Sequence, residues 1–188
     1  ETLSSMCFGG SGFRFVRIDF LDDVNVSIKN IVGDGAVYYG EQIFDYTGHD
    51  ARIKAIFDTA KRTIDLCCAT EYIWDGVKRD RLVWIGDIYP EMIAFVTLYG
   101  RGEILERSLD FIREQSPLPE WMNGFPTYSM WWMIICADYY KKTGCKDFAE
   151  RQLDYMAALL EQIDSCIKDD GEFEYPLYFV DWPTHDQI

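Results

Sequence analysis

The chain has 188 residues, of which 48% are hydrophobic, 16% aromatic and 27% charged, a composition typical of one globular core with room for a small module. Its 18 Lys and Arg residues stand against 32 Asp and Glu residues, so the formal net charge is -14. This balance argues against a nucleic-acid partner, which normally needs a basic surface. No apolar run approaches the roughly 20 residues of a membrane span.

The chain opens with Glu1 rather than Met, and its first 40 residues contain two stretches with a strand-like pattern. Residues 13–20 and 24–32 alternate between two faces, and Asp22-Asp23 lies at the turn between them. Two strands alone do not make a stable sheet. We therefore interpret the chain as a piece of a longer protein and expect residues 1–40 to end a β-domain that begins upstream.

From about residue 49 the apolar residues recur at three- and four-residue steps, which predicts helices. A first helix of roughly five turns is followed by four more, predicted at 91–99, 103–115, about 127–143 and about 147–168. Pro90 suits the first turn of the second helix. The array of one-faced and apolar helices suggests a helical toroid or solenoid, although no repeated motif is present.

The last two predicted helices differ in their apolar pattern. The fourth is apolar on nearly all faces from Met130 to Ala137, so we expect it to be buried on both sides. The fifth shows a single apolar face. Its members are Ala149, Leu153, Met156, Leu160, Ile163 and Ile167.

The six cysteines include no C-x-x-C pair, and there are only two histidines, so no metal site is expected. Four of them lie in apolar helical stretches, where a free thiol behaves as a small hydrophobe. These are Cys67, Cys68, Cys136 and Cys166. We predict core thiols, and the even count leaves a disulfide framework open.

The segment from Asp75 to Asp87 contains three acids, three bases, two glycines and a tryptophan within thirteen residues. Carboxylates beside an aromatic surface are what glycoside hydrolysis needs, because an acid protonates the leaving oxygen and a flat ring supports the sugar. On composition alone, a polar surface loop with ordinary ion pairs is the favoured interpretation of this segment.

This segment resembles the signature of family 78 of the glycoside hydrolases, the α-L-rhamnosidases. The matching positions are Asp75, Arg79, Asp80, Leu82, Trp84, Gly86 and Asp87. Residues 12–17 also resemble the strand that closes the β-domain before the barrel in that family, and Asp181-Trp182 resembles an Asp-Trp pair on a later barrel loop. The matches fall in the right order across nearly the whole chain.

The resemblance implies a mainly α fold. Residues 41–188 would form the first half of an (α/α)6 barrel, preceded in residues 1–40 by the last strands of a β-sandwich-type domain. It implies an enzyme that hydrolyses terminal α-L-rhamnosides with inversion and without a cofactor or metal. The partners would be a rhamnose-containing glycoside and the remainder of the parent chain, in a secreted or periplasmic setting.

The same resemblance assigns roles to residues. Asp80 lies where the family carries its general acid, and Asp75 and Asp87 match the carboxylates that hold sugar hydroxyls and the developing charge. Substrate-binding candidates are Arg79, Arg81, Trp84, Tyr72, Trp74, Asp181 and Trp182. No residue matches the family's general base, a glutamate on a loop expected beyond Ile188, so the chain should carry only the acid half of the site and be inactive alone.

Three departures bear on this interpretation. The usual glutamate of the acid position is Asp80, one methylene shorter; Gly76-Val77 replaces Cys-Pro; and Val83 replaces a frequent glycine. The alternatives are therefore a non-catalytic carbohydrate-binding or scaffold toroid, or a different (α/α)6 glycosidase, for example one acting on uronic acids.

Overall fold

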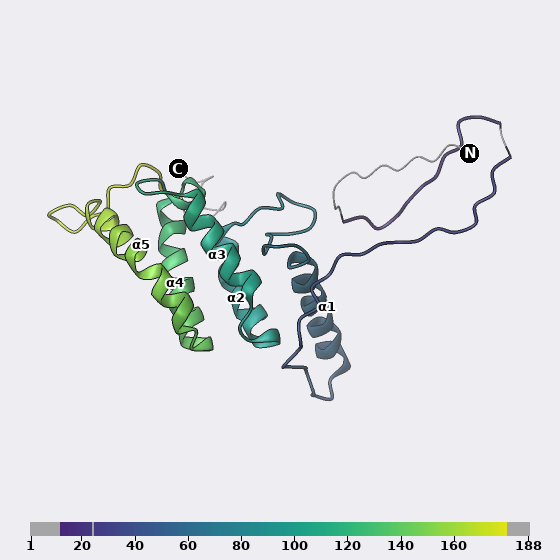
Figure 1. The fold of residues 1–188 in the computed structure, drawn as a ribbon, viewed down its shortest axis with the longest axis horizontal. Helices are drawn as coiled ribbons and strands as arrows, with labels where there is room; N and C mark the ends of the chain where they lie inside the picture. Colours follow the sequence, from purple (N-terminus) through teal and green to yellow (C-terminus); the bar gives the residue numbers. More distant parts are fainter. Residues whose placement is uncertain (1–11, 24, 180–188) are drawn as a thin grey trace.

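The computed structural model describes residues 12–23 and 25–179, and within these ranges the chain is mainly helical. Five α-helices follow one another, joined by loops and one 3-10 turn (Figure 1). They are α1 (Ala51–Cys67), α2 (Ile85–Tyr99), α3 (Glu103–Gln115), α4 (Pro126–Thr143) and α5 (Lys146–Asp164), with the 3-10 turn η1 (Met122–Gly124) before α4.

The segment before α1 contains neither helix nor strand among residues 12–23 and 25–50. The two predicted strands are therefore not confirmed. In the described part of the chain, the single β-bridge joins Ile167 to Phe173 after α5. The segment contacts the helices through Tyr38, whose N–H donates to the Asp65 carbonyl at 2.8 Å, and Ile43, whose N–H donates to the Leu98 carbonyl at 2.8 Å.

Local sequence explains several helix ends. Asp50 caps α1, because its carboxylate accepts hydrogen bonds from the N–H groups of Arg52 and Ile53. Gly144 ends α4 in the left-handed conformation, with φ of 67°, which a glycine adopts without strain. Pro126 stands at the start of α4, where a missing N–H removes no helical hydrogen bond.

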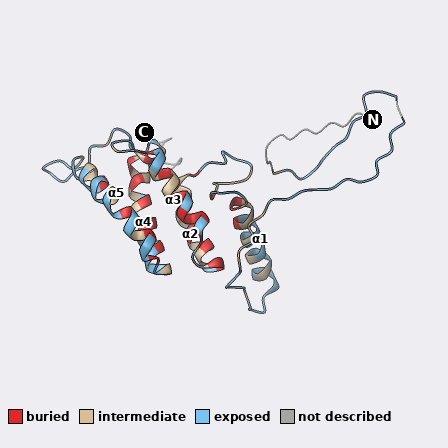
Figure 2. Cartoon of the chain, in the orientation of Figure 1, coloured by how far each residue is buried: buried red, intermediate tan, exposed pale blue. Residues whose placement is uncertain are grey.

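The core lies between α2, α3, α4 and α5 (Figure 2). Its largest fully buried side chains include Trp132, Tyr139, Phe95 and Phe148. The Trp132 indole N–H donates to the Leu109 carbonyl at 3.0 Å and so joins α4 to α3. By contrast, only Ile64 and Cys67 of α1 are buried.

The prediction for α2 was wrong at its beginning. Pro90 lies inside the helix rather than in its first turn, because α2 begins at Ile85. The Ile85 N–H is not capped locally; it donates to the side-chain oxygen of Asn123 at 3.1 Å. A contact from η1 therefore fixes where the helix starts.

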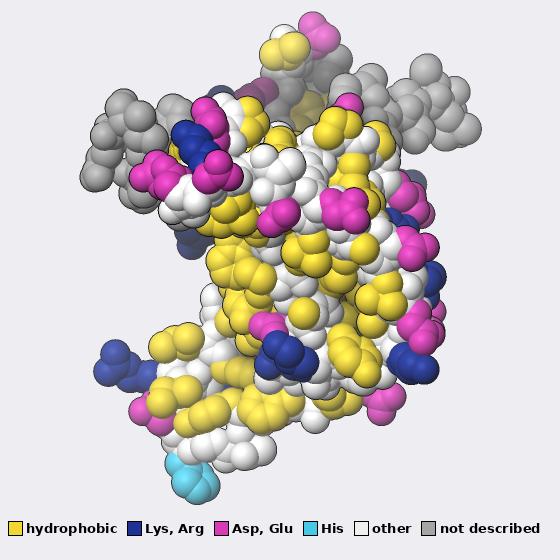
Figure 3. Space-filling model, turned by 90° about the vertical axis from the view of Figure 1, so that its left-hand side faces the viewer, with side chains coloured by type: hydrophobic (Ala, Val, Ile, Leu, Met, Phe, Trp, Pro, Cys, Tyr) yellow, Lys and Arg dark blue, Asp and Glu magenta, His cyan; other side chains and the backbone are white. Residues whose placement is uncertain are grey.

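The expected buried faces of α4 and α5 also need correction. Trp131 and Ile134 of α4 are 38% and 45% exposed, so that helix is not buried all round. On α5 the buried residues are Phe148, Gln152 and Leu159, whereas Leu153 and Leu160 are 57% and 53% exposed. Figure 3, which views the molecule from the α5 side, shows hydrophobic side chains gathered on this surface.

Three of the four cysteines predicted for the core are buried free thiols: Cys67, Cys68 and Cys136. The fourth, Cys166, is only partly buried, whereas Cys145, which was not predicted there, is buried. Cys136 is only 2% exposed, and burial raises the pKa of its thiol well above the ordinary value. Among the helices of the described residues, none has the length and apolar character needed to cross a membrane.

Candidate functional site

The loop between α1 and α2 closes on itself through Asp75. The Asp75 N–H donates to the Leu82 carbonyl at 3.1 Å, and the Leu82 N–H donates to Asp75 Oδ1 at 2.9 Å. Between them, Arg81 has a positive φ of 55°, a backbone conformation that turns the chain sharply. This closure brings the two ends of the acid- and arginine-rich segment together.

The three predicted acids gather around the guanidinium of Arg79. Its Nε lies 2.6 Å from Asp75 Oδ2 and 3.9 Å from Asp80 Oδ2, and its Nη2 lies 2.6 Å from Asp87 Oδ2. The hydrogen bond to Asp75, followed by that to Asp87, raises the pKa of Arg79. We call Asp75, Arg79, Asp80 and Asp87 the acid cluster.

The three carboxylates of the acid cluster differ in exposure. The Asp75 side chain is 0% exposed, whereas those of Asp80 and Asp87 are 51% and 44% exposed. Asp75 therefore shapes the loop, because both of its oxygens accept hydrogen bonds from within the segment. Asp80 and Asp87 present oxygen atoms to solvent, where they can accept hydrogen bonds from the hydroxyl groups of a ligand.

The predicted aromatic residues take different places. The Trp84 indole N–H donates to Asp80 Oδ2 at 3.1 Å, so this tryptophan orients the predicted acid. Its ring meets Tyr128 of α4 edge-on, with centroids 6.2 Å apart. Tyr72 instead packs against Phe111 of α3 with centroids 4.6 Å apart, which places it in the helical core rather than in the acid cluster.

Trp74, another predicted substrate-binding residue, lines a hollow. The hollow has a volume of about 640 Å³ and is lined by residues of the N-terminal segment, of α1 and of the loop. Arg62, Asp34 and Val77 contribute to the same wall. A concave site with an aromatic side chain and a few polar groups is typical of small-molecule binding. Trp74 is followed directly by Asp75, so the hollow and the acid cluster adjoin in the chain.

Two residues of the site escaped the sequence analysis. Asn123 of η1 accepts from the Ile85 N–H and donates from its Nδ2 to the Val83 carbonyl at 3.1 Å, so it clamps the end of the loop to η1. Its φ of 52° is a conformation that asparagine tolerates better than most residues. The Asn-Gly pair at 123–124 was the available signal, but it indicates only a turn.

Glu91 is the second missed residue. It lies on α2 one turn after Asp87, where residues four apart share a helix face. Burial, together with the charges of Asp87 and Asp75, raises its pKa to about 8, against the opposing effect of Arg79. If the start of α2 had been predicted correctly, the four-residue spacing would have placed Glu91 on the same helix face as Asp87.

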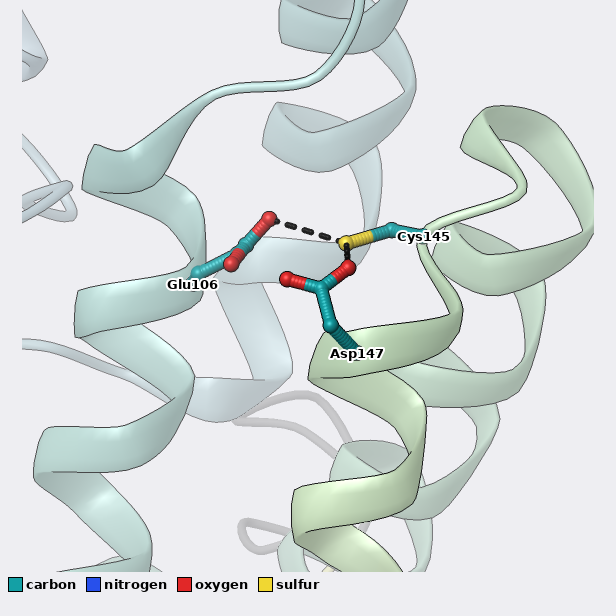
Figure 4. Close-up of side chains that lie close together, drawn as sticks. All are labelled: Glu106, Cys145 and Asp147. Carbon is teal, nitrogen blue, oxygen red and sulfur yellow. Dashed lines mark hydrogen bonds between the residues drawn. The ribbon is translucent and has the colours of Figure 1, made fainter.

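A second polar cluster lies between α3 and α5 and contains none of the residues predicted for the site. Glu106, Cys145 and Asp147 bring one ligand atom each within 4.8 Å of one another, as Figure 4 shows. A carboxylate–thiol–carboxylate set is chemically able to hold a divalent cation. Here, however, Arg101 donates to Glu106 Oε1 at 2.7 Å and to Asp147 Oδ2 at 2.7 Å. The guanidinium therefore already pairs with both carboxylates of this set.

The Glu106 cluster therefore acts as an internal ion-pair and hydrogen-bond network. The Tyr139 hydroxyl donates to Glu106 Oε1 at 3.0 Å, and the Cys145 thiol donates to the same oxygen at 3.2 Å. Burial raises the pKa of Glu106, but hydrogen bonds from Arg101, Cys145 and Tyr139 outweigh it, so the pKa is lowered. Burial and Glu106 raise the pKa of Cys145 to about 11, which leaves it a protonated, weakly nucleophilic thiol at neutral pH.

The remaining predicted residues are Arg81, Asp181 and Trp182. Arg81 is exposed in the loop, and Asp181 and Trp182 lie outside the described residues. No family model matches this chain, and a search of the curated proteins finds no match either.

Proposed function

We propose that the chain is the acid-bearing part of a glycoside hydrolase that acts on terminal α-L-rhamnosides with inversion of configuration. The observation that carries this proposal is the meeting of the three predicted carboxylates at the guanidinium of Arg79, two of them within 2.6 Å. On this proposal the five helices belong to an (α/α)6 barrel, and residues 1–40 belong to a preceding β-domain.

The exposed members of the acid cluster have separate roles in the proposal. Asp80 donates the proton to the leaving oxygen, and the Trp84 indole N–H fixes its orientation through Oδ2. Asp87 accepts hydrogen bonds from sugar hydroxyls and faces the developing positive charge. Asp75 holds Arg79 and the loop in place from the buried side. An inverting site separates its acid and base by roughly 6.5–9.5 Å so that water fits between them.

The test uses an enzyme that contains this chain together with the general base. We expect it to release rhamnose from an aryl α-L-rhamnoside, and we expect Asp80→Asn to slow hydrolysis of substrates with poor leaving groups by on the order of 10²–10⁴-fold, the usual contribution of general acid catalysis. Good leaving groups need less protonation and should lose less. Unchanged turnover in Asp80→Asn would exclude the role of Asp80.

The buried state of Asp75 favours one alternative, a non-catalytic carbohydrate-binding or scaffold toroid. Its two hydrogen-bonded oxygens give it a role in shaping the loop that needs no reaction. Calorimetry separates the two possibilities. Tight sugar binding by the intact protein without cleavage of any glycoside in a substrate panel would favour the binding protein.

A further inference from the structure

Glu91 is a buried acid that the proposed reaction does not use. Its Oε2 is inaccessible to solvent and has no hydrogen-bond partner among the described residues. A buried carboxylate oxygen without a partner is strongly unfavourable in the charged form, because the lost hydration is not replaced. The neutral acid has a much smaller cost of burial.

The one cation that acts on the charge of Glu91 by more than a minor amount, among the described residues, is Arg79, and its effect is outweighed by burial and by the charges of two acids. From the loop, Asp75 and Arg79 act on its charge, and from α2 itself Asp87 does. From the end of α1, the thiols of Cys67 and Cys68 face it. Arg79 has already paired its Nε with Asp75 and its Nη2 with Asp87. The other groups that interact electrostatically with Glu91 are two acids, Asp75 and Asp87, and the two thiols.

The two thiols do not offset the charge of Glu91. Burial, followed by the charges of Glu91 and Asp75, raises the pKa of Cys67 to about 11, and burial with Glu91 raises that of Cys68 further. Both thiols therefore stay neutral at neutral pH. An ionised Glu91 would add a third negative charge to those of Asp75 and Asp87, which already share the guanidinium of Arg79.

We infer that Glu91 is a positioning residue, held as a neutral carboxylic acid, whose proton keeps Asp75, Arg79 and Asp87 assembled at neutral pH. Its pKa of about 8 places the loss of that proton just above the neutral range. In alkaline solution the new charge repels Asp75 and Asp87 and competes with them for Arg79. If the proposed function holds, sugar binding at this cluster weakens over the same pH range.

The first experiment detects the proton without any ligand. Infrared spectroscopy of the wild-type chain at about pH 6 should show the carbonyl stretch of a protonated carboxyl, because ordinary Asp and Glu side chains are ionised there. The band should disappear by about pH 10 and be missing in Glu91→Gln. Absence of the band from the wild type at the lower pH would overturn the inference, even if the variant did not fold.

The second experiment follows stability against pH. Because the folded-state pKa is raised from 4.5 to about 8, the folded chain binds more protons than the unfolded chain between these values. The unfolding free energy of the wild type should therefore fall relative to Glu91→Gln as pH rises through this range and run parallel above it. Glu161→Gln, which removes an exposed acid of α5, is the matched control and should show no such divergence.

A third measurement separates a positioning role from simple burial. Glu91→Gln keeps the shape of the neutral acid and should keep rhamnose affinity constant across the alkaline range where wild-type affinity falls. An identical fall in both proteins would contradict the positioning role. If neither protein binds rhamnose while the wild type shows the infrared band, the proposed function fails and the protonated state of Glu91 stands.

Discussion

Arg79 Nε lies 2.6 Å from Asp75 Oδ2, and the Asp75 side chain is completely buried while the arginine is 58% exposed. The pair thus joins a buried acid to a base that reaches solvent. Its geometry fixes the loop that carries Asp80, because the other oxygen of Asp75 accepts the Leu82 N–H.

Replacing Asp75 by alanine should therefore destabilise the fold by about 1–3 kcal/mol, the usual effect of leaving buried partners of a charged group unsatisfied. The Leu82 N–H loses its acceptor and Arg79 loses its nearest carboxylate. Urea unfolding at neutral pH measures this change. Asp154→Ala on the exposed side of α5 is the control, and an equal effect in both variants would contradict the role of Asp75.

Gly86 offers a prediction about the packing beneath the cluster. A Cβ atom at this position would lie 2.6 Å from Cζ of the Tyr128 ring, whereas at Gly76 its nearest neighbour would be 4.0 Å away. Overpacking typically costs about 1–3 kcal/mol. We expect Gly86→Ala to lower the thermal midpoint by several degrees, because the overpacking outweighs the higher helix preference of alanine. We expect Gly76→Ala to change the midpoint little. The order of the two midpoints checks the prediction.

Glu106 predicts a pH dependence of the opposite sign to that of Glu91. Its folded-state pKa is lowered, so it stabilises the fold above the unfolded-state value of 4.5 and the stabilisation is lost as pH falls through the folded-state pKa. Glu106→Gln should be less stable than the wild type near neutral pH, and the gap should close in acid. Unfolding curves for both proteins across the acid range decide it; a constant gap would contradict the mechanism.

The exposed leucines of α5 predict association. Leu153 and Leu160 lie on the apolar surface of α5, and exposed apolar surface favours association. The net charge of -14 opposes association, because it makes copies of the chain repel one another. Sedimentation should show oligomers whose proportion rises with salt, since salt screens the repulsion. Leu153→Gln with Leu160→Gln should reduce association without loss of helix content. A chain that stays monomeric at high salt would contradict this expectation.

The helices were largely predictable because their signals are local. The bounds of α3 follow from Gly102 before it and Ser116-Pro117 after it, and the structure confirms Glu103–Gln115. The start of α2 was not predictable, because it depends on Asn123, which lies 38 residues away in the sequence. The buried face of α5 was also not predictable from the sequence. The periodicity indicated one apolar face, from Ala149 to Ile167, but the buried apolar residues of α5 are Phe148 and Leu159, which lie outside that set.

The candidate site was also predictable only in part. The family resemblance singled out Asp75, Asp80 and Asp87, and these are the carboxylates that lie around Arg79. Their environments were not visible in the sequence, since burial of Asp75 and of the Glu91 carboxyl follows from how the loop settles between α1 and α2. Tyr72 looked like a neighbour of the acids but packs on Phe111, because the chain turns between them.

The Asn123 side chain both contacts the loop that carries the acids and lines a second hollow. The same residue that holds the Val83 carbonyl and the Ile85 N–H also lines a second hollow, of about 470 Å³, beside Trp121. A single amide group is therefore shared between the lining of that hollow and the backbone that runs from Asp80 to Asp87.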